Sequence, residues 1–168
     1  MKYLTQNVRK LIPFTSKDKS RLSLQGVCIR GTKAVATNGH ILVEYDLERD
    51  QGMLCKFPAV SPSEVPDDDA QVVLPVVQLE KVFTSTPSSP RMPILRGMVL
   101  RTNGDKAEMI TNDLDAESKV ITRAIEGPYP DYERFFPTEK PIFRIGFNSE
   151  LFGMLKSLTP SDNINYKI

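Results

Sequence analysis

The sequence is poor in several features, and each shortage argues against a class of protein. Its 168 residues include only two cysteines, Cys28 and Cys55, which are too few for a disulfide framework and suit free thiols in a reducing cytosol. No run of about 18 apolar residues occurs, so no transmembrane helix is predicted. The first residues lack the apolar stretch of a secretory signal, and we therefore expect a cytoplasmic protein.

Motifs of catalysis and metal binding are missing as well. The sole histidine, His40, could join a catalytic triad, but no G-x-S-x-G nucleophile motif accompanies it. The cysteines form no C-x-x-C pair of the kind that zinc sites use, and no glycine-rich phosphate loop is present. We predict a binding protein that is not an enzyme and that needs no metal or cofactor.

The composition is that of a globular domain, but the charge is unevenly distributed. With 40% hydrophobic and 26% charged residues, the chain can bury a core of its own. The net charge is +1, yet residues 1–33 carry +7 and the remainder carries −6. Such asymmetry is typical of a protein with one electropositive face. Lysines scattered over an ordinary solvated surface would give the same count.

Hydrophobic spacing predicts two similar halves. The first half is expected to hold one helix and three short strands, over residues 3–12, 22–28, 34–36 and 41–45. A polar connection over 48–70 includes an acidic run at 67–69, which has no expected role beyond solvation. The second half is expected to hold a strand, a helix and three strands, over residues 72–74, 75–84, 94–101, 106–111 and 117–124. This order predicts an α+β domain in which two helices cover one side of curved antiparallel sheets.

Three motifs are unusual in combination: Arg21–Val27, Ala36–Leu42 and Gly127–Pro137. Each motif alone is explained by turn glycines and core residues. Together, in this order and spacing, they resemble the middle domain of the bacterial DNA polymerase III beta subunit, the sliding clamp. Val72–Phe83 resembles the strand and second helix of that domain, and the resemblance covers about residues 3–137.

The chain also departs from the family pattern. Asn38 stands where the family has aspartate, which keeps the chemistry of the turn, and Ile41 stands where the family has arginine, which removes a cation and puts unaltered partner specificity in doubt. Family chains hold three such domains. Here we expect one clamp domain over 1–137, followed over 138–168 by the start of a further clamp-like domain or a helical appendage, with a helix over 149–158. A naturally short clamp, bacterial or from a phage, and a fragment are both open.

The resemblance implies a DNA clamp (processivity) fold and a non-catalytic role in DNA replication. A sliding clamp is a ring that encloses double-stranded DNA without reading its sequence. Helices line its hole, so the inner face needs cations that meet phosphates. The matching basic residues lie on the two predicted helices and in the loop after the first: Arg9, Lys10, Lys17, Lys19, Arg21 and Lys81. The alternative for each is a solvated surface position, and for Arg21 a structural pair with a carboxylate.

The resemblance also implies a hydrophobic cleft that captures short peptide motifs from partner proteins. The matching positions are Leu24, Thr37, Gly39, His40, Ile41, Leu42, Pro130, Arg134 and Phe135. The apolar members would form the floor, and His40 and Arg134 would hydrogen-bond the peptide at the rim, unless His40 is a turn histidine satisfied by local backbone. The family's next domain supplies part of the cleft, and here Leu151, Phe152 and Leu155 would have to take that part.

The expected partners are therefore double-stranded DNA, DNA polymerase and other proteins with a clamp-binding motif, a clamp loader, and further copies of the chain in a homo-oligomeric ring. The alternative is a clamp-derived interaction module that binds a protein partner without forming a ring.

Overall fold

The computed structural model describes residues 1–58, 61–87, 91–136 and 138–139. Met1–Asp131 is one compact unit, and Tyr132–Ile168 is a second. The expected helix over 149–158, with Leu151, Phe152 and Leu155, lies outside the described residues. The interpretation of 138–168 as the start of a further domain stays a prediction.

The first unit repeats one order of elements: a strand, a helix and three strands. The first half consists of β1 (Lys2–Leu4), α1 (Gln6–Arg9), β2 (Gly26–Arg30), β3 (Lys33–Thr37) and β4 (Leu42–Asp46). The second half consists of β5 (Val72–Pro75), α3 (Val76–Ser85), β6 (Met98–Asn103), β7 (Lys106–Asn112) and β8 (Glu117–Arg123). The predicted repeat is therefore present, and the first half also begins with a strand.

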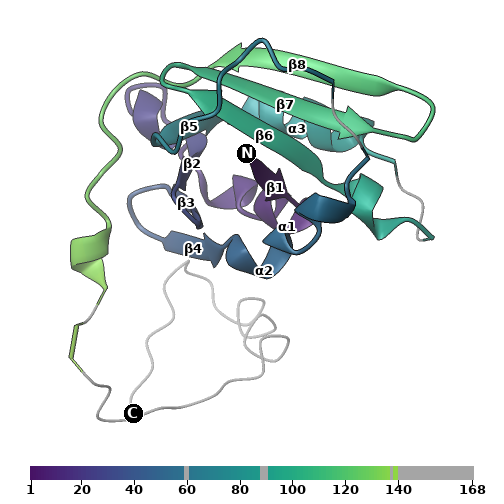
Figure 1. Ribbon diagram of the computed structural model, residues 1–168. Coiled ribbons are helices and arrows are strands. Elements are labelled where there is room, and N and C mark those ends of the chain that lie inside the picture. The colour runs from purple at the N-terminus through teal and green to yellow at the C-terminus, as the bar shows by residue number, and fades with distance from the viewer. Residues whose placement is uncertain (59–60, 88–90, 137, 140–168) are drawn as a thin grey trace, which may run out of the picture. The chain divides into compact units, whose positions relative to one another are not determined.

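Each half lends its first strand to the sheet of the other half. The two antiparallel sheets have the strand orders β1-β6-β7-β8 and β4-β3-β2-β5 (Figure 1). Lys2 of β1 lies opposite Leu100 of β6, and Val27 of β2 lies opposite Leu74 of β5. This exchange ties the two halves together, because neither sheet is complete without a strand from the other half.

The main core lies between the two sheets and the helices. α3 buries Leu79, Val82 and Phe83, which share one face at helical spacing, and α1 adds Val8. α1 packs against α3. The α+β class with antiparallel sheets is confirmed.

The expected helix over 3–12 is wrong at both ends. Lys2–Leu4 pairs with β6 as a strand, and α1 begins only after Thr5, whose hydroxyl accepts a hydrogen bond from the Asn7 amide at 3.2 Å. A 3-10 helix, Ile12–Phe14, follows α1. Leu4 and Val8 both enter the core, so their spacing predicted burial correctly while strand pairing decided the backbone.

Two strand starts are corrected in the same way. Leu22–Leu24 is a 3-10 helix before β2, and Pro93–Arg96 is a 3-10 helix before β6. Leu22 is exposed, so the alternation that predicted a strand from this residue does not match the burial. Pro93 has no amide hydrogen to give to a strand ladder, which favours a turn at that position.

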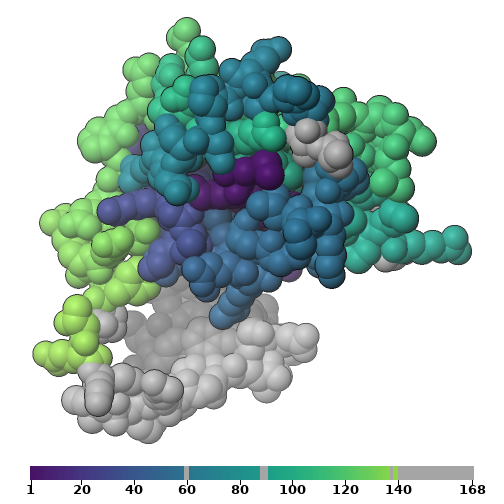
Figure 2. All heavy atoms as spheres, in the orientation of Figure 1, coloured from purple at the N-terminus to yellow at the C-terminus, as the bar shows by residue number. Residues whose placement is uncertain are grey.

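The connection over 48–70 is more structured than its polarity predicts. It contains α2 (Glu48–Gln51) and a 3-10 helix, Leu54–Lys56, and it buries Phe57 and Val65. The Phe57 ring lies 5.8 Å from the Tyr3 ring, in a second small cluster on the face of β1 and β6 opposite the main core. Figure 2 shows the N-terminal residues, in purple, flanked by the blue residues of this connection.

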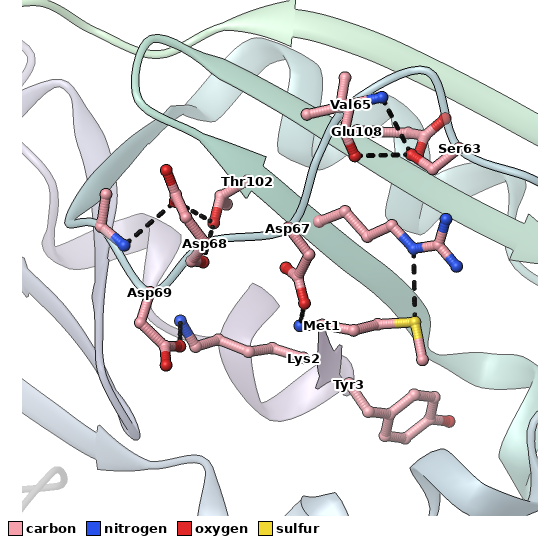
Figure 3. A network of polar contacts seen from close by, with 12 residues as sticks. Met1, Lys2, Tyr3, Ser63, Val65, Asp67, Asp68, Asp69, Thr102 and Glu108 are labelled. Carbon is pink, nitrogen blue, oxygen red and sulfur yellow. Dashed lines mark hydrogen bonds and ion pairs between the residues drawn. The ribbon is translucent and has the colours of Figure 1, made fainter.

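The acidic run at 67–69 fastens the connection to the sheet (Figure 3). The Asp68 amide donates to the Thr102 carbonyl at 2.7 Å, and the Gly104 amide donates to the Asp68 carboxylate at 3.1 Å. Asp67 forms an ion pair with the Met1 amino group, and Asp69 forms one with Lys2. The expectation of solvation alone is therefore wrong for this run.

A buried carboxylate marks a second attachment of the connection. Glu108 on β7 is fully buried, accepts a hydrogen bond from the Ser63 hydroxyl, and lies 4.0 Å from the Lys119 ammonium. Nearby, Glu117 accepts hydrogen bonds from Ser61. Burial raises the pKa of Glu117, but those hydrogen bonds and the charge of Lys119 outweigh it and hold this pKa below its ordinary value.

Candidate functional site

In the expected cleft, a network of hydrogen bonds fixes the turn between β3 and β4. The Thr37 hydroxyl donates to the Ile41 carbonyl at 2.7 Å. The side-chain oxygen of Asn38 accepts the amides of His40 and Ile41, at 2.9 and 3.0 Å. An aspartate could accept the same two amides, which supports the view that asparagine keeps the chemistry of this turn. The tightly bonded backbone holds His40 and Ile41 out in solvent.

Gly39 gives the turn room for an arginine. Its φ is +92°, and a Cβ built on it would lie 2.7 Å from a guanidinium nitrogen of Arg21. Arg21 therefore packs over the turn, although the resemblance places it among the DNA-contacting cations. It also forms an ion pair with Asp18 at 3.7 Å. Hydrogen bonds from Ser20 and the charge of Arg21 hold the pKa of Asp18 below its ordinary value.

This position of Arg21 links two parts of the expected cleft. Arg21 precedes the 3-10 helix that carries Leu24, and its guanidinium reaches the 37–41 turn. Leu24 and Thr37 are buried, whereas Leu42 is half-buried. Sequence reasoning missed the role of Arg21 at the turn. The glycine in the Asn-Gly pair is the signal that could have indicated a close neighbour there.

The third sequence motif, Gly127–Pro137, begins beside β3. The Tyr129 hydroxyl donates to the Val35 carbonyl at 3.3 Å, and Tyr129 is buried. Gly127, with a φ of +111°, makes the bend that brings the chain to this point. Pro130, which follows Tyr129, is exposed. The expected cleft residues of the first unit thus come from the 3-10 helix before β2, from the β3–β4 turn and from the segment 127–131.

Arg134 and Phe135 belong to the second unit. They lie in a 3-10 helix, Glu133–Phe135, where the Arg134 guanidinium stands 5.2 Å from the centre of the Phe135 ring. Tyr132 meets Phe136 edge to face, with ring centres 6.4 Å apart. Phe135 is 68% exposed, which leaves an aromatic surface beside a cation. Their part in a cleft with the β3–β4 turn stays a prediction.

All six expected DNA-contacting residues are exposed, including Arg21. Arg9 and Lys10 stand at the end of α1, Lys17 and Lys19 in the loop that follows, and Lys81 on α3. Lys10 donates to the side chain of Asn7 at 3.1 Å. Exposed cations on neighbouring helices are what phosphate binding needs, and they are also what a solvated surface provides.

Comparisons with known proteins identify structures that share this fold. No protein-family model matches the chain, and no curated protein does. Among solved structures, the H. pylori beta clamp bound to a DNA ligase peptide aligns with a TM-score of 0.52 and 16% identity, over 82% of this chain and 35% of that chain. The C. crescentus beta sliding clamp aligns with a TM-score of 0.50 and 19% identity, over 82% of this chain and 34% of that chain.

The chain has the fold of a sliding-clamp domain. It spans about a third of the length of the clamps it matches, which corresponds to a partial, clamp-like domain. Within the residues that the structure describes, no helix is both long and apolar enough to cross a membrane.

Proposed function

We propose that this chain is a cytoplasmic sliding-clamp domain that holds double-stranded DNA without sequence specificity and docks partner proteins through a peptide cleft. It acts as a non-catalytic processivity factor in replication. The observation that carries the proposal is the clamp fold joined to exposed cations on α1, the following loop and α3. The alternative is a clamp-derived interaction module that forms no ring.

The free sheet edges support ring formation. The β1 edge is capped by Gln51, whose side chain bonds both the amide and the carbonyl of Tyr3 at 3.2 Å. The β5 edge is covered where the Ile125 amide donates to the Val73 carbonyl at 2.9 Å. Among the described strands, none pairs with the outer edges of β4 and β8. Unpaired edges are templates for another sheet, so copies or partner domains can join there into a closed wall.

The helices would form the inner surface of such a ring. Arg9 and Lys10 on α1, Lys17 and Lys19 after it, and Lys81 on α3 would meet phosphates and give an affinity that falls with salt. None of these contacts needs a particular base, because phosphates carry no sequence information directly. A clamp loader would place the ring on DNA.

The β3–β4 turn with Arg21 supports the docking role. The H. pylori clamp binds a DNA ligase peptide, and a peptide of that kind is the partner we propose here, together with DNA polymerase and other proteins that carry clamp-binding motifs. Leu24, Thr37 and Leu42 would line the floor, and each buried apolar anchor of the peptide would contribute about 1.5–3 kcal/mol. Ile41 in place of a cation would favour an apolar neighbour on the peptide.

The first test is the solution mass, measured by light scattering over a wide concentration range. A closed assembly several times 18.9 kDa supports the ring. A monomer at every concentration contradicts a ring built from this chain alone and favours the interaction module.

The second test is binding of a fluorescent DNA ligase peptide to the intact chain. His40→Ala and Arg134→Ala should each weaken binding about tenfold and leave DNA retention unchanged. Arg91→Ala, an exposed cation outside the cleft, is the matched control. Unchanged affinity in both cleft variants would contradict the cleft.

A further inference from the structure

A groove with apolar walls lies apart from the β3–β4 turn. Its volume is about 690 Å³. Its lining comes from two parts of the chain: a first wall of residues between Ile12 and Gln25, and a second wall formed by Pro75, the start of α3 and residues 125–126. Leu22 on the first wall is 61% exposed, and Val77 on the second is 60% exposed. Exposed aliphatic side chains that line the same groove are typical of a protein-docking surface.

The two walls carry opposite charges. Lys17 and Lys19 belong to the first wall, and Glu80 and Glu126 belong to the second. No ion pair is formed by any of these four side chains within the described residues. DNA phosphates could meet the lysines, but they would leave Leu22 and Val77 uncovered. A protein segment with an apolar tip and an acidic side fits the first wall better.

The turn between β7 and β8 offers such a tip. Leu114 is 57% exposed and has a φ of +82°, a conformation that leucine rarely adopts. The backbone is fixed there: Asn112 accepts the Leu114 amide at 2.7 Å, and Asp113 accepts the amides of Asp115 and Ala116 at 3.1 and 2.6 Å. The structure therefore holds a leucine outward between two aspartates, in a strained backbone conformation that these hydrogen bonds maintain.

The tip and the groove lie at opposite ends of β8. Leu114 precedes the strand, and residues 125–126 of the groove follow it (Figure 1). β8 has seven residues, and its six steps of about 3.3 Å separate its ends by about 20 Å. A chain cannot fill its own groove with this tip, but a second copy can.

We propose that the β7–β8 tip of one copy docks into this groove of a second copy. Leu114 packs against Leu22 and Val77, and the aspartates face Lys17 and Lys19. The glutamates of the opposite wall repel the aspartates and so fix which way the tip enters. Because tip and groove are different surfaces, the contact is head-to-tail and each copy can bind two neighbours. The contact needs neither DNA nor the peptide cleft, so it does not rest on the proposed function. It is an alternative to joining copies at the β4 and β8 edges, and it occupies Lys17 and Lys19, which leaves Arg9, Lys10 and Lys81 for phosphates.

Complementary variants test this contact. Leu114→Asn removes the exposed leucine of the tip, and asparagine tolerates the positive φ. The double variant Leu22→Ser and Val77→Ser removes the exposed aliphatic side chains of the groove. We expect the unaltered chain to associate in light scattering and each variant alone to be monomeric. An equimolar mixture of the two variants should form a 1:1 dimer and nothing larger, since one contact survives. The control is Ile121→Ser, at an aliphatic residue outside both surfaces that is 46% exposed; this variant should associate like the unaltered chain.

Charge variants give a second readout, because substitutions on the two walls should change the strength of association in opposite directions. Lys17→Glu with Lys19→Glu should weaken association at least tenfold, whereas Glu80→Gln with Glu126→Gln should strengthen it. A monomeric unaltered chain, a mixture without dimer, or the reverse order of charge effects would overturn the proposal. A closed assembly that persists in both the tip variant and the groove variant would also overturn the proposed contact. That result would still be compatible with a ring joined at β4 and β8.

Discussion

Replacing Gly39 by alanine tests how the β3–β4 turn is built. The backbone at Gly39 has a φ of +92°, and an added Cβ would lie 2.7 Å from a guanidinium nitrogen of Arg21. The positive φ costs an alanine about 1–2 kcal/mol. The arginine must also leave the turn, which adds little because its side chain is already half-exposed. We therefore expect the free energy of unfolding to fall by about 1–2 kcal/mol, which lowers Tm by roughly 2–8 °C in a chain of this size. Binding of the ligase peptide should weaken as well, because Arg21 no longer lies over the turn.

The assay is urea unfolding of Gly39→Ala beside a matched glycine control. Gly52 ends α2 with a φ of −59° and has no atom within 4 Å of an added Cβ, so Gly52→Ala should be neutral or slightly stabilising. Adding Arg21→Ala to Gly39→Ala removes the steric part and leaves the backbone part, which a double-mutant cycle separates. Equal stability of the two glycine variants would refute the reasoning about this turn.

Three further predictions concern the described fold. Asp68→Ala should lower the free energy of unfolding by about 1–2 kcal/mol, because it removes an acceptor from the β6–β7 hairpin. Asp69→Ala removes a solvent-exposed carboxylate whose ion pair with Lys2 is screened on that side, and it should cost about 0.5 kcal/mol or less; equal losses in urea unfolding would contradict this. Burial raises the pKa of Cys28 to about 12, so iodoacetamide at pH 8 should label Cys55 alone in the folded chain and both thiols in urea; equal rates when folded would be inconsistent. The lowered pKa of Glu117 means that it stabilises the fold above the ordinary carboxyl pKa of about 4.3, and that this contribution disappears as pH falls through the folded value; Glu117→Gln should flatten the pH dependence of unfolding there, and an unchanged slope would contradict the assignment.

Most of the fold could be predicted from hydrophobic spacing, because strands and helices bury residues at fixed periods. The Asn103-Gly104 turn signal predicted the β6–β7 hairpin, and the bounds expected for β7 and β8, 106–111 and 117–124, agree with the structure within a residue. β1 could not be found this way: Tyr3 and Leu4 fit a helical stripe with Val8, and only the long-range pairing with β6 makes them a strand. The connection was misjudged because Phe57 and Val65 are isolated apolar residues in a polar stretch, where no period reveals burial.

The candidate site could be predicted in part. The motif around Gly39 predicted a turn, and the structure has one, with Asn38 in the expected role. Arg21 was placed among the DNA-contacting cations by the resemblance, with a structural pair to a carboxylate as the alternative, and the structure pairs it with Asp18. Its place over the turn depends on contacts between distant residues, which the sequence does not reveal. The groove was not predicted at all. Leu22 and Val77 look like core residues in the sequence, and only their exposure in the fold distinguishes them.

Retention on closed circular DNA tests whether the chain encloses DNA, as proposed. The chain is bound to circular plasmid DNA at low salt, the salt is raised to weaken phosphate contacts, and one half of the sample is linearised before filtration. We expect the protein to stay on the circles and to be lost from the linear DNA, because a ring can slide off an end. Equal retention on both forms would contradict topological binding and leave the interaction module as the function of this chain.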